Sequence, residues 1–395
     1  MVFAPSLVAA IAVATFQPFA LAVLGADIIG DLGISRQQLG LAVTANTIVA
    51  AVLSPVIGGV TDRLGARTAT ILVLLTGAAG LAATGAAGGY GVLIIASAFA
   101  GVSQAGGNPA TNKLISIHVP PGRRGVVTGV KQSGVQVGVS LAGLTLPVLA
   151  ASLDWRGAIL TTAAVAGALV VPALWLAPDP VDPPVARSAA PDRRIPASIW
   201  LLTGYGTLLG LAAGATTIYI PLYAREVFGM SSEAAGGLVT VMGLAGVVAR
   251  LWWGRVAEAT LGPRPSLVVI AVLAAGAGTV LALAPDLGPW TLWPAVLLVA
   301  ASVSAWNAVG MLTVIQDVGS HMTGRASGVV LLGFLAGLGS GAPAMGRSVD
   351  VSGSYRLGWF GVAAVSLLAL PFVVGRLRGG REMMCDNRPS APGES

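Results

Sequence analysis

The sequence predicts an all-α membrane protein in which twelve transmembrane helices form two six-helix halves related by a pseudo-two-fold repeat. Composition is the first reason: 55% of the 395 residues are hydrophobic and only 10% are charged, whereas soluble domains contain about 25% charged residues. The second is that the apolar residues form long unbroken runs, each sufficient for the ~20 residues that cross the hydrocarbon as a helix. The third is a short charged loop that occurs once in each half.

The apolar runs define the predicted helices in chain order. Helices are expected because lipid offers the backbone no hydrogen-bond partners, and the alternative, a β-barrel, requires alternating segments of about ten residues. The predicted spans cover residues 6–28, 38–59, 68–88, 91–117, 124–151, 156–177, 198–223, 233–255, 266–285, 290–316, 324–346 and 356–376. The first run is longer than the apolar core of a signal peptide and no basic residue precedes it, so it is interpreted as a span.

A segment rich in proline and charge divides the spans six and six. We expect an N-terminal half over residues 1–177, a cytoplasmic linker over 178–197 and a C-terminal half over 198–378. The polar residues 379–395 are expected to form a disordered cytoplasmic tail.

The distribution of basic residues predicts the orientation. If the N-terminus is inside, the basic residues of the inside loops and tail are Arg63, Arg67, Arg123, Arg124, Arg187, Arg193, Arg194, Arg255, Arg264, Arg325, Arg376, Arg378, Arg381 and Arg388. Those of the outside loops are Arg36, Arg156, Arg225, Arg347 and Arg356. This excess of fourteen over five predicts a multi-pass protein of a bacterial plasma (inner) membrane with both termini in the cytoplasm. Because the basic residues are spread through loops and form no patch, we expect no nucleic-acid partner.

The composition also excludes several kinds of chemistry. Cys385 is the only cysteine and His118 and His321 are the only histidines, so disulfides and Cys or His metal sites are not expected. The sequence contains no Walker loop, no paired carboxylates and no Ser/His/Asp arrangement with a usable His. We therefore expect no enzymatic activity, no cofactor and no metal.

The charged loop between the second and third spans reads GGVTDRLGAR from Gly58 to Arg67, and a weaker copy extends from Gly254 to Arg264. Such a pair of loops resembles the signature of the major facilitator superfamily. The resemblance implies secondary transport by alternating access, with the solute site between the halves near the membrane midplane. It also implies a cytoplasmic gating role for Gly58, Asp62, Arg63, Gly65, Arg67, Gly254, Arg255 and Glu258. The alternative is an ordinary basic inside loop.

Three cations lie within predicted spans, where an ionisable residue is costly and indicates function by default. Lys113 lies near the end of its span, where it can extend to the headgroups. Lys131 lies seven residues after Arg124, about 10 Å deep, which favours a role in a cavity. The run from Lys131 to Gly134 is similar to that of the cyanate/nitroimidazole-type transporters.

The third cation, Arg250, lies four residues before Gly254. The oxalate and monocarboxylate transporters resemble the chain here, and the resemblance implies that Arg250 pairs with a substrate carboxylate. A guanidinium suits this role because its planar fork matches two carboxylate oxygens. The chain departs from those families at Trp252 and Trp253, and nothing obvious in its eleventh span replaces the second cation that the oxalate carriers use. The alternative is that Asp317 or carbonyl groups of a neighbouring helix hold Arg250.

Neutral polar residues in the spans complete the predicted site, although such residues often only join helices. The predicted substrate-binding residues are Arg250, Lys131, Gln132, Gln136, Asn108, Asn112, Tyr219, Asn307, Gln17 and Asn46. Tyr219 and Tyr223 are interpreted either as an outer gate or as part of an interfacial aromatic belt.

The net positive charge of the predicted cavity favours a small organic anion, carboxylate-like, as the substrate of a monomeric carrier. No span contains a central Asp or Glu, so a coupled proton would travel on the substrate, Lys131 or Asp27; anion exchange and facilitated diffusion stay open. The alternatives are a drug/proton antiporter and a transporter-like sensor.

Overall fold

The computed structural model describes residues 4–120, 123–176, 194–318 and 323–373, and its regular structure in these ranges is helical. The helices are α1 (Ala4–Val23), α2 (Gly25–Leu32), α3 (Arg36–Leu64), α4 (Ala66–Gly85), α5 (Tyr90–His118), α6 (Arg124–Ala168), α7 (Val170–Leu176), α8 (Ala197–Phe228), α9 (Ser232–Ala259), α10 (Pro263–Leu287), η2 (Pro289–Thr291), α11 (Leu292–Ala301), α12 (Trp306–Asp317), α13 (Thr323–Ser352) and α14 (Tyr355–Leu368). The predicted tail, and the predicted linker up to residue 193, lie outside the described residues.

Eleven stretches in the described ranges are long and apolar enough to cross a membrane. One of them, the 48-residue stretch Val127–Leu174, contains both the fifth and the sixth predicted spans. The chain turns between them at Asp154, which has a φ of 59° and accepts a 2.8 Å hydrogen bond from the Gly157 N–H. The prediction of twelve crossings is therefore confirmed.

Breaks within three spans were not predicted. The first span bends at Leu24 and continues as α2, the sixth is broken at Leu169, and the tenth is divided into α11 and α12 by residues 302–305. The tenth span contains no glycine or proline at its break, so hydropathy alone predicts a continuous helix there. Interruption of a membrane helix is tolerated where the freed backbone groups line a cavity.

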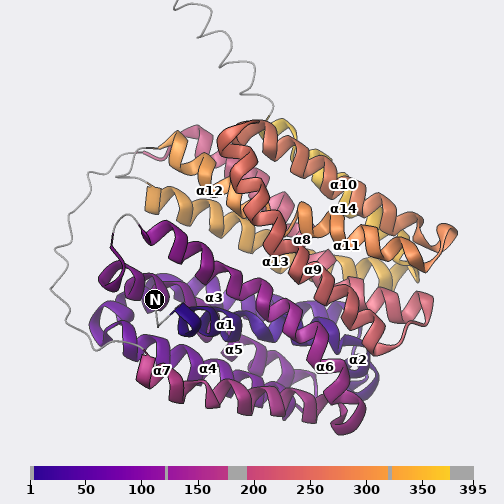
Figure 1. Cartoon of the computed structure of the whole chain (residues 1–395). Helices are drawn as coiled ribbons and strands as arrows, with labels where there is room; N and C mark the ends of the chain where they lie inside the picture. Colours follow the sequence, from indigo (N-terminus) through magenta and orange to yellow (C-terminus); the bar gives the residue numbers. More distant parts are fainter. Residues whose placement is uncertain (1–3, 121–122, 177–193, 319–322, 374–395) are drawn as a thin grey trace, which may run out of the picture.

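The two halves repeat the same packing. In the first half α1 packs on α6, α3 on α5 and α4 on α6; in the second α8 packs on α13, α9 on α11 and α10 on α14. Gly65 and Gly262, the matching glycines of the two charged loops, have nearly identical backbone angles, with φ/ψ of 82°/156° and 79°/158°. The repeat predicted from these loops is therefore present in the backbone, and Figure 1 shows the indigo-to-magenta half beside the orange-to-yellow half.

The halves touch along α3–α13 and α6–α9, and the close approaches between these helices run from one end of the bundle to about its middle. We call that end, where α3 begins, the Arg36 end, and the opposite one the Asp62 end. A Cβ added at Gly40 would lie 2.6 Å from the Pro343 backbone N, and one added at Gly236 would lie 2.6 Å from Pro147 Cγ. At the Asp62 end, a Cβ at Gly58 or Gly254 would meet nothing within 4 Å. The close approaches between the halves lie towards the Arg36 end, so we describe the bundle as closed at that end and open at the Asp62 end.

Candidate functional site

A cavity of about 220 Å³ lies between the two halves. Its walls come from α1, α3, α5 and α6 of the first half and from α8, α9, α12 and α13 of the second. The polar residues in these walls are Thr15, Thr47, Gln104, Asn108, Gln132, Gln136, Thr217, Arg250, Ser304 and Asn307. Phe19, Trp306 and Phe334 supply aromatic surface. Of the predicted substrate-binding residues, five line this cavity: Arg250, Gln132, Gln136, Asn108 and Asn307.

Arg250 projects from α9 and is held by one carbonyl group from each half. Its Nε donates a 2.9 Å hydrogen bond to Ser304 O, and its Nη1 donates a 3.4 Å hydrogen bond to Gln132 O. Ser304 lies in the break of the tenth span, so the break supplies a carbonyl that a continuous helix would have used internally. Two of the five guanidinium N–H groups are used in this way, which leaves others for a ligand.

No carboxylate in the described ranges forms an ion pair with Arg250. The alternative that Asp317 holds it is wrong, because Asp317 Oδ1 lies 2.8 Å from Arg264 Nη2. The alternative of neighbouring carbonyl groups agrees with the observed hydrogen bonds.

Lys131 is buried beside the cavity, with 1% of its surface exposed. Its Nζ donates hydrogen bonds to Asn108 Oδ1 at 3.0 Å and Asn112 Oδ1 at 2.6 Å, and no described carboxylate pairs with it. Both asparagines are exposed, although Asn108 lies ten residues before the end of α5, about 15 Å from that end. An exposed carboxamide at this depth indicates a vestibule that reaches the cavity from the open Asp62 end.

Three polar atoms of residues in the cavity wall have no hydrogen-bond partner among the described residues. They are Gln104 Oε1, Asn307 Oδ1 and Trp306 Nε1, and all three are buried. Buried polar groups are nearly always satisfied by protein, water or ligand. The cavity therefore suits a polar occupant that offers both hydrogen-bond donors and acceptors, water included.

Five predicted binding residues do not line the cavity: Lys131 and Asn112 are joined to each other beside it, and three others lie elsewhere. Gln17 Nε2 donates to Ser97 Oγ at 2.8 Å, and Asn46 Nδ2 donates to Gln17 Oε1 at 3.4 Å, which joins α1, α3 and α5 within the first half. Tyr219 donates a 2.6 Å hydrogen bond to Arg36 O at the Arg36 end. The aromatic-belt interpretation is wrong for Tyr219 and Tyr223, because 0% and 1% of their surfaces are exposed.

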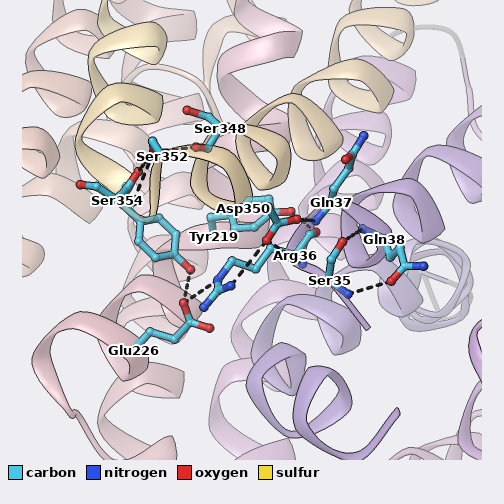
Figure 2. Close-up of polar contacts among 11 residues, drawn as sticks. Ser35, Arg36, Gln37, Gln38, Tyr219, Glu226, Ser348, Asp350, Ser352 and Ser354 are labelled. Atoms are coloured by element: carbon cyan, nitrogen blue, oxygen red, sulfur yellow. Dashed lines mark hydrogen bonds and ion pairs between the residues drawn. The ribbon is translucent and has the colours of Figure 1, made fainter. Parts of the chain in front are cut away.

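A polar cluster at the Arg36 end joins the halves, and Figure 2 shows Arg36 extending from α3 towards Glu226 with Asp350 beside it. Arg36 Nε lies 2.9 Å from Glu226 Oε2 on α8, and its Nη1 lies 3.5 Å from Asp350 Oδ1 on α13. Tyr355 of α14 donates a 2.6 Å hydrogen bond to the same Glu226 oxygen. Sequence reasoning missed this cluster, because its charges lie at the ends of separate spans and only the packing of the halves brings them together.

A third ion pair joins the halves at the same end. Asp27 of α2 accepts two hydrogen bonds from Arg225 of α8, at 2.7 and 2.9 Å. Asp27, the acidic residue suggested as a proton carrier, is therefore occupied by an arginine and does not line the cavity.

The predicted gating residues lie at the open Asp62 end, and most of them are helical. Gly58, Asp62 and Arg63 belong to the end of α3, and Gly254, Arg255 and Glu258 belong to the end of α9, so both helices extend through most of the predicted loops. Asp62 is 68% exposed, and its Oδ1 lies 3.9 Å from Lys113 Nζ, which also donates to the carbonyl groups of Thr61 and Asp62. Arg67 donates to Leu174 O, which connects the first loop to α7. Arg63, Arg255 and Glu258 are exposed near the ends of their helices.

Residues 6–342 of the chain match the sequence model of the Major Facilitator Superfamily. A Mycobacterium tuberculosis protein named "Probable nitrate/nitrite transporter NarK2" is 30% identical over 361 residues, which cover 87% of this chain and 88% of that protein. A Cupriavidus necator protein named "Probable sulfoacetate transporter SauU" is 23% identical, with 83% of this chain and 82% of that protein covered. An uncharacterized MFS-type transporter of Mycobacterium tuberculosis is 28% identical over 70% of this chain, and the match spans 63% of the relative's length.

Among solved structures, a bacterial homologue of the human lysosomal transporter Spinster, in an inward-facing and occupied conformation, superposes with a TM-score of 0.75. The superposition covers 98% of both chains at 15% identity, so the likeness concerns the fold alone.

Proposed function

Because this chain belongs to the major facilitator superfamily, we propose that it carries a small organic anion across the plasma membrane by alternating access. The observation that carries the proposal is Arg250, a cation in the wall of the cavity between the halves that has no described carboxylate partner. A charge inside the membrane is costly unless a partner neutralises it. An anion that accepts two parallel hydrogen bonds from the guanidinium would supply that partner.

The names of two relatives support an anionic substrate, since nitrate, nitrite and sulfoacetate are all anions. The unpartnered atoms of Gln104, Asn307 and Trp306 would complete the ligand's hydrogen bonds. A drug/proton antiporter is less well supported, because no acidic residue in the described ranges lines the cavity.

The proposed orientation places the Asp62 end in the cytoplasm, in keeping with the excess of basic residues in the loops assigned to that side. The described conformation then corresponds to the state open to the cytoplasm. In the opposite state the Asp62 loops would close and the Arg36 cluster would separate.

A thermal-shift screen of the purified protein tests the substrate class. Monocarboxylates, dicarboxylates, nitrate, cyanate and lipophilic cations would each be added at increasing concentration. A ligand that binds the folded state stabilises it by RT ln(1 + [L]/Kd), so even millimolar affinity raises the melting temperature at high concentration. We expect stabilisation by organic anions; stabilisation by lipophilic cations alone would contradict the proposal.

Substitutions of Arg250 test the residue itself. Arg250→Lys keeps the charge but loses the planar fork, and should weaken anion binding about tenfold or more. Arg250→Ala should nearly abolish binding with little loss of folded protein, because the partners it leaves are two carbonyl groups and no buried carboxylate. Arg347→Gln, which removes an exposed arginine of α13, is the control. A stable Arg250→Ala variant with unchanged anion affinity would rule out this site.

A further inference from the structure

Lys131 is a second cation for which the structure provides no negative partner. Most other basic residues in the described ranges pair with carboxylates or lie exposed near the ends of helices. Lys131 instead donates to two neutral carboxamide oxygens, those of Asn108 and Asn112, and its side chain is buried. Burial of a cation is costly without a counter-charge, and two amide dipoles compensate only part of that cost.

The Lys131 ammonium is hydrogen-bonded to a residue of the cavity wall, Asn108. Gln104 and Asn108 line the cavity, and Asn112 follows one helical turn later towards the open Asp62 end. On α6, the next residue after Lys131 is Gln132, which also lines the cavity and whose carbonyl group accepts from Arg250. The ammonium is therefore connected to the cavity wall by a single hydrogen bond, the one that it donates to Asn108 Oδ1.

We propose that the transported anion carries two acidic groups, one bound by Arg250 and the other by Lys131. This inference rests on the proposed function, and it names the substrate class as small dianions. The flexible four-carbon stem of lysine lets its ammonium turn from the two asparagines to the ligand. The asparagines are exposed to the vestibule, so water replaces the hydrogen bonds that they lose.

Charge balance favours a dianion over a monoanion. The empty site holds two positive charges in a region of low polarity, from Arg250 and Lys131. A monoanion would neutralise one of them and leave the other unpaired, whereas a dianion neutralises both. A charge-assisted hydrogen bond adds about ten- to hundredfold in affinity, which sets the size of the expected preference.

The test compares divalent with monovalent anions of similar size on the purified full-length protein. Malonate and sulfoacetate are the divalent probes, and propionate and methanesulfonate are the monovalent ones. We expect the unmodified protein to bind the divalent probes at least about tenfold more tightly. Lys131→Met should remove this preference and leave the affinity for the monovalent probes within about threefold. Arg347→Gln, which also removes one positive charge but far from the cavity, should keep it.

A second variant separates ligand binding from a purely structural role of Lys131. Asn112→Asp places a carboxylate where the carboxamide oxygen lies 2.6 Å from Lys131 Nζ, so the lysine gains a permanent partner and its link between α5 and α6 is retained. This variant should stay folded and lose the preference for divalent anions.

An Asn112→Asp variant that keeps the preference would overturn the inference. So would a Lys131→Met variant that weakens both classes of anion equally and lowers the melting temperature, because that result would make Lys131 a structural link between helices. If the unmodified protein binds the monovalent and divalent probes equally, Lys131 is no ligand, while the proposal for Arg250 still stands. If it binds neither class, the proposed function itself is wrong.

Discussion

Arg250 shows how a membrane protein can keep a cation available without an ion pair to any carboxylate that the structure describes. Its guanidinium donates to Gln132 O in the first half and to Ser304 O in the second. Carbonyl dipoles compensate part of the charge, and an anion that accepts the same hydrogen bonds can displace them. Since one carbonyl group belongs to each half, ligand binding at Arg250 would also change a contact between the halves.

Gln17 gives the clearest contrast with Arg250 among the predicted binding residues. Its side chain joins Ser97 and Asn46 within the first half, so Gln17→Ala should destabilise the fold by about 1 kcal/mol. Anion affinity should stay within about twofold, because Gln17 does not line the cavity. Chemical denaturation and ligand titration of the same preparation measure both quantities. Weaker anion binding by Gln17→Ala at unchanged stability would contradict this prediction and show that Gln17 takes part in binding.

The sequence predicts which polar residues share a helix face, and it does not predict what that face contacts. Helical spacing places Gln104, Asn108 and Asn112 on one face; in the structure the first two line the cavity and the third accepts a hydrogen bond from Lys131. Gln17 and Asn46 satisfy the same rule of a polar residue within a span, yet they face neighbouring helices of their own half. Which side is lipid, helix or cavity depends on how twelve helices pack, and local pattern does not contain that information.

At the scale of elements, α6 and α9 form one of the two main contacts between the halves. Gly143 and Gly236 face each other so closely that a Cβ at Gly236 would collide with Gly143 O and lie 2.6 Å from Pro147 Cγ. Close approach of this kind is typical of small residues at helix interfaces in membranes. Closure of the Arg36 end therefore depends on the absence of a side chain at these positions.

Gly236→Val should prevent this closure and hold the protein open at the Arg36 end. Transport should fall at least about tenfold, because alternating access requires both ends to close in turn. Distances between spin labels on α6 and α9, in a background without Cys385, would report the separation of the helices. Gly276→Val on α10 is the matched control, since a Cβ there meets nothing within 4 Å. An unchanged label distance in Gly236→Val would contradict this prediction.

Hydropathy predicts the number of spans well, because each needs the same length of apolar chain, and it misses the breaks. The interruption at residues 302–305 occurs within the sequence Ala301–Ser302–Val303–Ser304, where every residue is compatible with a helix. The break leaves the Ser304 carbonyl free to accept from Arg250. Its cause is therefore tertiary, and it could be recognised only after α9 and the tenth span are placed side by side.

At the scale of the whole molecule, the Arg36 cluster connects the two halves through one cation. Glu226 and Asp350 both belong to the second half, and Arg36 of the first half forms an ion pair with each. These pairs are partly exposed, with 34% of the Arg36 side chain accessible, so each contributes modestly. Their position is what matters, because they exist only while the Arg36 end is closed.

Arg36→Gln should shift the population towards the state open at the Arg36 end. Loss of the two ion pairs leaves Glu226 and Asp350 without their shared cation, and the ratio of open to closed molecules should rise about two- to fivefold. Spin labels on α3 and α13 would measure the two populations. Arg347→Gln serves again as the control, and a ratio that is the same in both variants would argue against a gating role for the cluster.

The two unpaired cations of the site have a consequence for the kinetics of exchange. Between its two open states a carrier must pass through a form that is sealed from water on both sides. An empty sealed form would trap Arg250 and Lys131 in a dry interior with two charges uncompensated, whereas a loaded one would enclose a neutral set of charges. The empty carrier should therefore return slowly, and anion on the opposite side of the membrane should accelerate release of labelled anion. Counterflow would then outpace net flux, without any residue dedicated to coupling the two movements.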